Sequence, residues 1–303
     1  MPFTRRALLG RAAAAAAAPA LAPGKAAGAL LPREDEPAAG RATPRAEPAA
    51  SPLRLPPLPP GSRPFAPGEV LRYAVTFQGF TAGEATLAVL GPATIGPQSG
   101  LLVRYTADSR GIVAAFYRLH DRVEALLDPL FLFTRRYESW IEQGRRRRHR
   151  IVTFDPAAKR YVRTEEGGDT TTGPLDRDVV DGLGLVYHLR VKPLQAGARL
   201  TVPVFRRREA ALVTLGAAGP VTVSTPAGRF ETLEVKPAAP EGPRPRASGD
   251  DGGLLGGTAT IWFTTDPRRI PVRLAGSGKA GSIEARLTAI ELPTVRAGEG
   301  KIP

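Results

Sequence analysis

An arginine-rich run is the part of this sequence with the clearest capacity to bind a ligand. It reads Arg145-Arg146-Arg147-Arg148-His149-Arg150. Successive side chains of a β-strand point to opposite faces, so both faces here would be basic, and we expect this end of a hairpin to project into solvent. Such a cluster favours anionic lipid head groups or other envelope polyanions, and the alternative is a solubilising surface. The candidate anion-binding residues are Arg145, Arg146, Arg147, Arg148 and Arg150.

Catalytic and metal chemistry have little support in the residue types and their spacing. Cysteine is absent, which excludes thiolate metal sites and a cysteine nucleophile. The histidines are too scattered for a local ligand motif, being His120, His149 and His188. There is no G-x-S-x-G and no H-E-x-x-H motif. A hydrolase would need carboxylates that converge only in the fold, and the candidates that the sequence cannot pair are Glu69, Glu84, Glu124 and Glu138.

Two further patterns resemble binding motifs but have simpler explanations. Asp176, Asp178 and Asp181 have the alternate spacing of part of a calcium loop, without its glycine and terminal glutamate, so helix capping explains them better. The segment 276–281 matches G-x-G-x-x-G, but a dinucleotide site needs a helix after it, and residues 282–287 have a strand pattern. We therefore predict a glycine-rich β-turn there, and expect no cofactor and no metal.

The elements that must position these residues are mainly strands. From Phe65 onward, short alternating runs are bounded by Gly, Pro and Asp, and the 33 glycines and 31 prolines of the 303 residues disfavour a helical fold. Closely spaced strands favour curved antiparallel sheets, arranged as a half-barrel or a sandwich, with a long loop over 237–257. The predicted strands are 70–77, 82–90, 101–107, 123–127, 130–141, 148–154, 161–164, 200–205, 211–215, 221–225, 230–235, 259–263, 272–274 and 283–290.

One segment, near residues 178–191, has helical spacing instead. Val179, Leu183 and Val186 recur at three- and four-residue intervals and share a face, and Pro193 ends the pattern. Asp176 or Asp178 would cap its start. We predict a single helix packed on, or plugging, the curved sheet, and a short helical turn within 111–119.

The N-terminus resembles an export signal. Arg5-Arg6 precedes two apolar residues, as in a twin-arginine signal, and the apolar run 12–22 would span roughly 17 Å as a helix, too short for a bilayer core of about 30 Å. Cleavage would follow Ala22 or Ala29. We predict a signal peptide over 1–29, a Pro/Ala-rich linker over 30–64, a β domain over 65–293 and a tail over 294–303. The mature protein would have no transmembrane span and would be periplasmic or secreted.

Four blocks resemble a bacterial family of exported proteins of unknown function, the DUF3108 family. They are Gly68–Tyr73 with Gly79–Ala85, Asp181–Arg190, Thr225–Thr232 and Ile261–Val272, in order within about 65–292. The resemblance implies an exported, β-rich domain, and it carries over no catalytic residues. The glycines of the opening block also suit the sharp turn and close strand contact of a curved sheet.

These observations favour binding over catalysis. The formal net charge of +13 bears on possible partners and not on the fold. An exported protein rarely meets nucleic acid, so we expect no nucleic-acid partner. The leading hypothesis is an exported envelope protein that binds a lipid or other amphiphile in its curved sheet. The alternatives are a surface scaffold that binds envelope polyanions through Arg145–Arg150, and a hydrolase.

Overall fold

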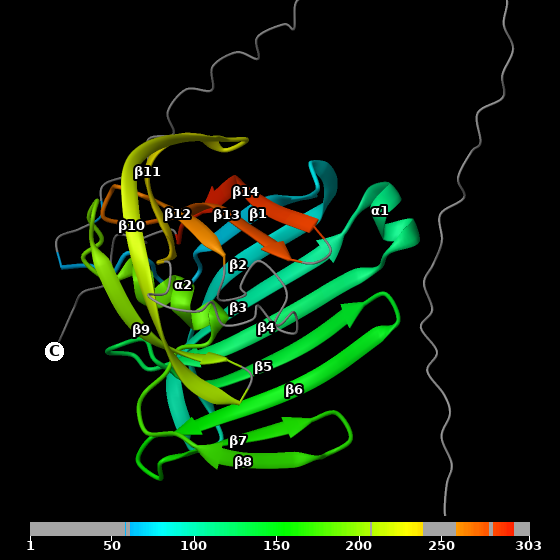
Figure 1. The fold of residues 1–303 in the computed structure, drawn as a ribbon, viewed down its shortest axis with the longest axis vertical. Helices are drawn as coiled ribbons and strands as arrows, with labels where there is room; N and C mark the ends of the chain where they lie inside the picture. The colour runs from blue at the N-terminus through cyan, green and yellow to red at the C-terminus, as the bar shows by residue number, and fades with distance from the viewer. Residues whose placement is uncertain (1–57, 59–60, 207, 239–258, 279–280, 294–303) are drawn as a thin grey trace, which may run out of the picture. The chain divides into compact units, whose positions relative to one another are not determined.

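The computed structural model describes residue 58 and residues 61–206, 208–238, 259–278 and 281–293. In these ranges the chain forms one antiparallel sheet of fourteen strands, with two helices (Figure 1). In chain order the elements are β1 (Val70–Phe77), β2 (Phe80–Ile95), β3 (Gln98–Ser109), α1 (Gly111–Phe116), β4 (Leu119–Leu127), β5 (Thr134–Gln143), β6 (Arg146–Asp155), β7 (Arg160–Glu165), β8 (Thr170–Pro174), α2 (Gly182–Arg190), β9 (Arg199–Arg206), β10 (Glu209–Thr225), β11 (Gly228–Pro237), β12 (Thr260–Thr264), β13 (Pro271–Gly278) and β14 (Gly281–Glu291).

The sheet consists of two antiparallel meanders, β1 to β8 and β9 to β14, which are joined where β1 pairs with β14. The strand order is β8-β7-β6-β5-β4-β3-β2-β1-β14-β13-β12-β11-β10-β9. The first and last strands pair with each other, with Val70 opposite Glu291. Neighbouring strands are therefore close in sequence everywhere except at the β1–β14 pair, which leaves β8 and β9 as the edges.

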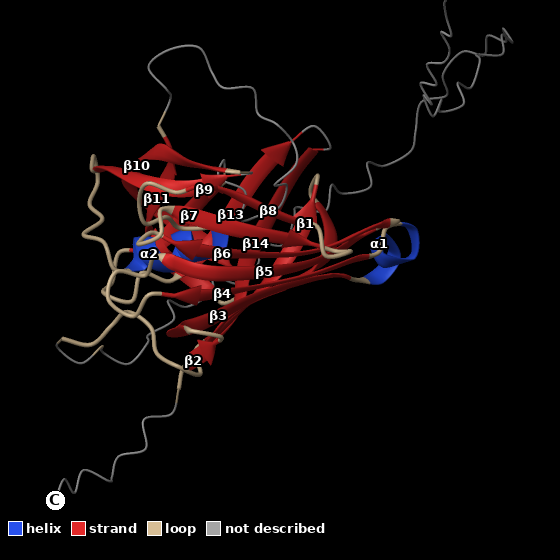
Figure 2. Cartoon of the chain, turned by 90° about the horizontal axis from the view of Figure 1, so that it is seen from below, coloured by secondary structure: helices blue, strands red, loops and turns tan. Residues whose placement is uncertain are grey.

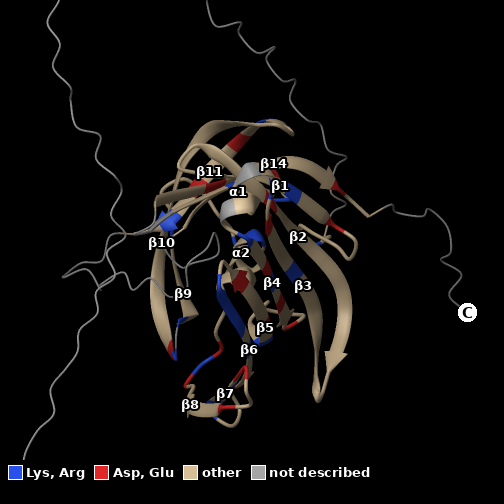
Figure 3. Ribbon diagram, turned by 90° about the vertical axis from the view of Figure 1, so that its right-hand side faces the viewer, with Lys and Arg blue, Asp and Glu red and all other residues tan. Residues whose placement is uncertain are grey.

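The sheet curves strongly enough to bring one edge over the other half. Phe205 of β9 packs edge-on against Phe154 of β6 and Tyr161 of β7, with ring centroids 4.8 Å apart in each pair. Val180, between β8 and α2, forms a parallel bridge with Val204 of β9. The residues before α2 therefore connect to the edge strand of the other meander, and Figure 3 shows the strands curving around α2.

Glycines and register shifts accompany this curvature. Gly79 has φ +84° in the β1–β2 turn, and a Cβ on Gly83 would lie 2.0 Å from the carbonyl oxygen of Asp108. The register shifts between Val75 and Thr76, next to Gly83 on the paired strand. This confirms the close strand contact expected at the two-glycine opening.

Alternate residues of most strands form an apolar core with α2. We call the face of the sheet that carries these buried residues and α2 the inward face, and the opposite one the outer face. Leu71 and Tyr73 of β1 are buried there, as are all residues of α2 from Leu183 to Arg190. Figures 1 and 2 show α1 at the opposite end of the strands from α2. Within the described ranges, neither helix has the length and apolar character needed to cross a membrane.

The fold class is confirmed: curved antiparallel strands with one packed helix. Of the two arrangements left open, the strands form one continuous sheet, not two facing ones. The helical turn after residue 110 is confirmed as α1, and the glycine motif lies in the β13–β14 hairpin, where Gly278 is opposite Gly281. The predicted signal, most of the linker, almost all of the 237–257 loop and the tail lie outside the described residues.

Several predicted boundaries were wrong for local reasons. The strand predicted from residue 130 begins at Thr134, because the Asp128 carboxylate accepts hydrogen bonds from the backbone N–H groups of Leu130 and Phe131 and holds a turn. The two strands predicted over 211–215 and 221–225 are one strand, β10, whose register shifts between Ala218 and Val221. The exposed strand β8 was missed, because its Thr-Thr-Thr-Gly-Pro sequence has no apolar alternation.

The helix cap was also assigned to the wrong aspartates. Asp181 is the N-cap: its two carboxylate oxygens accept from the N–H groups of Leu183 and Gly184, each at 3.0 Å. Thr134 of β5 donates to the same carboxylate at 2.7 Å and accepts from the Asp181 N–H at 3.0 Å. Asp176 instead pairs with Arg177, and Asp178 with Arg135, so the three aspartates have separate partners.

Candidate functional site

The register of β3 to β6 places part of the arginine run on the inward face. Arg148 lies opposite Ile141, Ile141 opposite Asp121, and Asp121 opposite Ala107 of the buried core. Residues directly opposite in paired strands share a face. Arg148 therefore points inward, and by alternation so do Arg146 and Arg150, while Arg147 and His149 point outward.

The five predicted anion ligands therefore occupy three environments. Arg145 and Arg147 are exposed at the β5–β6 turn, and the Arg147 side chain is 75% exposed, 3.8 Å from Glu142. Arg146 is exposed at the start of β6, and Arg148 is half-buried. Arg150 is buried and bonded to Glu165 at 3.0 Å. The expectation that both faces of this strand project into solvent is corrected: the inward face is enclosed progressively from Arg146 to Arg150.

Asp121 of β4 is an inward carboxylate that lies across β5 from Arg148. Gln143 donates to its Oδ2 at 2.7 Å, and its Oδ1 is buried without a hydrogen-bond partner among the described residues. Burial raises the pKa of Asp121 to about 6, with the Gln143 hydrogen bond and the charge of Arg148 opposing that rise. The same carboxylate contributes to a raised pKa of Tyr105, whose main cause is again burial.

Apolar side chains adjoin these polar groups on the inward face. Tyr105 of β3 and Leu119 and Val123 of β4 are half-buried and pack on the main hydrophobic core. Ile283 and Val213, from the other meander, are half-buried against the same core. The inward face towards the α1 end is thus apolar and incompletely covered, next to arginines and one carboxylate.

Two of the four carboxylates that the sequence could not pair lie on the outer face. Glu124 and Glu138 lie opposite each other on β4 and β5. Glu124 accepts from Arg104 at 2.7 Å and from Arg122 at 2.6 Å, and these arginines lower its pKa against the effect of burial. Glu138 pairs with Arg136 at 2.6 Å and with His149 at 2.7 Å. Each of these carboxylates therefore pairs with at least one arginine on the outer face.

The histidines have three unrelated environments. His149 stacks on Trp140 with centroids 5.2 Å apart, and His120 Nδ1 lies 2.5 Å from Asp108 Oδ1. His188 of α2 donates to the Phe131 carbonyl at 2.9 Å, and burial lowers its pKa to about 4. Across the described residues, no three His, Cys, Asp or Glu side chains gather closely enough to hold a metal ion.

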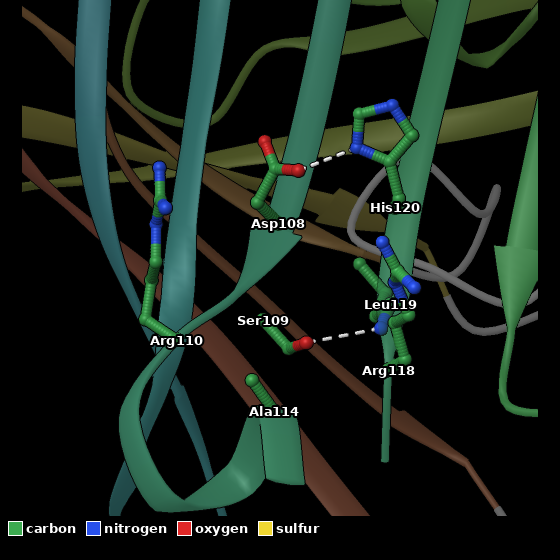
Figure 4. Close-up of a pocket in the computed structure, with 7 residues that line it drawn as sticks. All are labelled: Asp108, Ser109, Arg110, Ala114, Arg118, Leu119 and His120. Carbon is green, nitrogen blue, oxygen red and sulfur yellow. Dashed lines mark hydrogen bonds and ion pairs between the residues drawn. The ribbon is translucent and has the colours of Figure 1, made fainter.

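A cavity of about 360 Å³ lies beside α1 (Figure 4). It is lined by Asp108, Ser109, Arg110, Ala114, Arg118, Leu119 and His120. Ser109 accepts from the Leu119 N–H at 3.0 Å and points away from the His120 ring, which pairs with Asp108 (Figure 4). A serine nucleophile therefore has no base here, and the one carboxylate in the lining is Asp108, so the cavity lacks the carboxylate pair of a glycosidase-type hydrolase.

Three of the blocks that carry the family resemblance meet at one buried ion pair. Arg190, at the end of α2, donates to both carboxylate oxygens of Glu69, and both side chains are at most 1% exposed. Its Nε donates to the Arg268 carbonyl at 3.2 Å, and Tyr73 donates to the Pro271 carbonyl at 2.7 Å. The guanidinium also lies 4.8 Å from the Phe65 ring centroid. This cluster joins β1, α2 and the segment before β13.

The family model described as "Protein of unknown function (DUF3108)" matches residues 72–288. The chain belongs to the DUF3108 family. No curated protein matches it. Among solved structures, a beta-barrel-like protein of the DUF1849 family from Brucella abortus has a TM-score of 0.48 at 9% identity, covering 76% of this chain and 99% of its own.

Two further structures resemble this DUF3108 protein over 76% of its length and 98% of their own. One is described as a "putative lipoprotein" from Parabacteroides distasonis, with a TM-score of 0.30 and 12% identity. The other is a "putative exported protein with YmcC-like fold" from Bacteroides fragilis, with a TM-score of 0.29 and 14% identity.

Sequence reasoning missed two features of this DUF3108 site. Asp121 carries no local signal, because its burial comes from pairing with β3 and β5. The partner of Arg190 is 121 residues away, so it could not be found by spacing. The signal that could have found the pair is the presence of a charged residue at an otherwise apolar helical position, since buried charges are almost always paired.

Proposed function

We propose that this protein is exported and acts in the envelope by binding an anionic amphiphile on the inward face of its sheet. Export is supported by the sequence alone, through the Arg5-Arg6 pair and the short apolar run that follows it. Binding is supported by the character of the inward face towards α1. Function as a carrier needs no catalytic group.

The row of inward arginines on β6 carries this proposal. The inward face of a curved sheet normally holds apolar side chains, and charged residues there are costly unless paired. The register of β4 to β7 places four arginines and two carboxylates on this face. The arginines are Arg146, Arg148, Arg150 and Arg163, and the carboxylates are Asp121 and Glu165. An anionic head group at the open end would add charge-assisted hydrogen bonds to Arg146 and Arg148, beside the contacts that these arginines already make within the chain.

Each part of an amphiphile has a matching surface. The alkyl chain would lie against Tyr105, Val123 and Leu119, which are half-buried on the core. The anionic head would lie near Arg146 and Arg148, closer to the α1 end. Because α2 already fills the other end of the inward face, the head group would remain near the open end.

The buried oxygen of Asp121 refines the expected head group. Its Oδ1 lacks a hydrogen-bond donor in the described residues, and a buried acceptor without a donor costs about 1–3 kcal/mol. A hydroxyl on the head group would supply that donor. An anionic head with a neighbouring hydroxyl therefore fits best.

Native mass spectrometry of the protein purified gently from an envelope extract, followed by organic extraction, tests the proposal directly. We expect a reproducible adduct that contains an alkyl chain and an anionic head. A bare mass across several detergents and salts would argue for a packed core that binds nothing.

A ligand pair isolates the role of the arginines. Oleate and oleyl alcohol share a chain and differ in head charge, so oleate should bind the stripped protein more tightly. Arg148→Gln should weaken oleate binding by roughly tenfold and leave oleyl alcohol unchanged, because the lost contact is a charge-assisted hydrogen bond. Arg122→Gln, on the outer face, is the matched control. Equal losses for both variants would contradict an inward head-group site.

A further inference from the structure

Exposed aromatic rings and arginines gather where the strands end beside α1. We call this set the α1-end surface. It is formed by the β1–β2 turn, the segment around α1 and the β5–β6 turn. Its members are Phe77, Phe80, Tyr117, Arg118, Arg145 and Arg147.

Backbone contacts hold these three segments side by side. Arg110, before α1, donates its N–H to the Ala82 carbonyl at the start of β2, at 3.0 Å. Gly144 donates to the Arg118 carbonyl at 2.7 Å, and a Cβ on Gly144 would lie 3.3 Å from the Tyr117 ring. Four strand spacings of about 4.8 Å separate the two outer turns, so the surface is roughly 20 Å wide.

The rings on this surface are unusually exposed for aromatic residues. Phe80 is 75% exposed, Tyr117 48% and Phe77 38%. Phe77 and Phe80 lie opposite each other across the first turn. Large apolar side chains that are exposed together indicate a contact with a partner or a membrane.

The arginines on the same surface have few carboxylate partners among the described residues. Arg118 and Arg145 are exposed, and within the part of the chain that the structure describes neither forms an ion pair. Figure 4 shows Arg118 at the cavity beside α1. Arg147 is 75% exposed, at 3.8 Å from its nearest carboxylate, a distance that gives little stabilisation at a surface.

We infer that the α1-end surface docks on an anionic lipid bilayer. The arginines would contact lipid phosphates while the rings of Phe77, Phe80 and Tyr117 enter the head-group boundary. A soluble polyanion would need the arginines alone and would leave the rings exposed to water. The combination of charge and exposed rings therefore favours a bilayer.

The opposite end of the strands provides an internal comparison. The β4–β5 turn exposes Leu130 by 74% and Phe131 by 61%. Its charges are balanced, because Arg135 pairs with both Asp128 and Asp178 while Arg63 donates to the Pro129 carbonyl of the turn. That turn is as apolar as the α1-end surface but lacks its uncompensated arginines.

Co-sedimentation of the purified protein with vesicles tests the inference. We expect binding to phosphatidylglycerol–phosphatidylcholine vesicles, little binding to pure phosphatidylcholine, and weakening as salt rises. Arg118→Gln combined with Arg147→Gln should weaken binding by roughly tenfold or more, since each arginine contributes about one charge contact. Phe80→Ser should weaken binding by roughly tenfold even at high salt. The control, Leu130→Ser combined with Phe131→Ser, should bind as the unmodified protein does.

Two outcomes would overturn the inference. If the control variant loses as much binding as Phe80→Ser, docking does not belong to this surface. If the arginine variant loses binding but Phe80→Ser does not, and soluble heparin displaces the protein fully, the surface is a polyanion site. The inference does not depend on the proposed amphiphile site, because oleate binding by the stripped protein requires no bilayer.

Discussion

Arg190 and Glu69 form a doubly hydrogen-bonded ion pair across 121 residues of sequence, and neither side chain reaches solvent. The pair connects the end of the buried helix to the residue before β1. Its guanidinium also donates to the carbonyls of Pro64 and Arg268, so every donor group of Arg190 contacts an acceptor in the chain. Such a charge is tolerated in a core because it is fully paired.

Glu69→Gln should destabilise the domain by about 3–5 kcal/mol, because it leaves the Arg190 charge buried without its counterion. Urea unfolding measures the change. Glu291→Gln is the matched control: it breaks the Arg72–Glu291 pair, whose side chains are 53% and 52% exposed, and should cost less than about 1 kcal/mol. Similar losses for the two variants would show that Arg190 is neutralised by something other than Glu69.

Gly184→Ala should destabilise the protein although alanine is the better helix former. A Cβ there would lie 2.5 Å from Thr134 Oγ1 and 2.8 Å from Asp181 Oδ1, inside the buried cap of α2. Overpacking at such a site costs about 1–3 kcal/mol, which exceeds the roughly 1 kcal/mol that the higher helix propensity of alanine contributes.

Gly216→Ala is the control for that substitution, since a Cβ at Gly216 meets nothing within 4 Å. It should leave the free energy of unfolding unchanged or raise it by a few tenths of a kcal/mol, by restricting the unfolded chain. Thermal unfolding of both variants provides the comparison. A stabilised Gly184→Ala variant would mean that α2 can move away from β5.

The sequence was sufficient for the class of fold because the strands carry local signals. Strand β1 was predicted at its observed bounds, and the helix was found from the spacing of Val179, Leu183 and Val186. Those patterns depend on neighbours in sequence and on one buried face. Where a turn signal competes with a strand pattern, as at Asp128 before β5, the predicted start of the strand differs from the observed one by a few residues.

The candidate site was not predictable in the same way, because it depends on register. Alternation alone makes both faces of residues 145–150 basic, and only pairing with β5 shows that Arg150 is enclosed with Glu165. Likewise Glu124 and Glu138 are opposite each other only because β4 and β5 pair in one particular register. The sequence identified the arginine-rich strand and left its inward side unassigned.

Two buried groups should give opposing pH dependences. The folded pKa of Asp121 is raised from 3.8 to about 6, so the folded state binds its proton more tightly, and this group lowers stability as pH rises between those values. The folded pKa of His188 is lowered from 6.5 to about 4, so the unfolded state binds that proton more tightly, and this group raises stability as pH rises.

Because the two windows overlap, the unmodified protein should show little change from these groups between about pH 4 and 6. In Asp121→Asn only the pH dependence due to His188 should remain, so the free energy of unfolding should fall by about 2–3 kcal/mol on acidification through that window. In His188→Gln only the pH dependence due to Asp121 should remain, so the free energy of unfolding should rise on acidification. Urea midpoints at several pH values distinguish the slopes, and parallel curves for both variants would contradict the two assignments.

Export should depend on the paired arginines at the N-terminus. Arg5→Lys combined with Arg6→Lys keeps the charge of this segment but removes the twin-arginine pair, so the precursor should accumulate inside the cell if that route is used. Mass spectrometry of the envelope fraction should find a mature N-terminus after Ala22 or Ala29, the two candidate cleavage positions. Arg33→Lys, in the predicted linker, is the control and should leave export unchanged. Full export of the double-lysine variant with the same cleavage would assign the general secretion route instead, and an uncleaved chain in the envelope would overturn the predicted signal peptide.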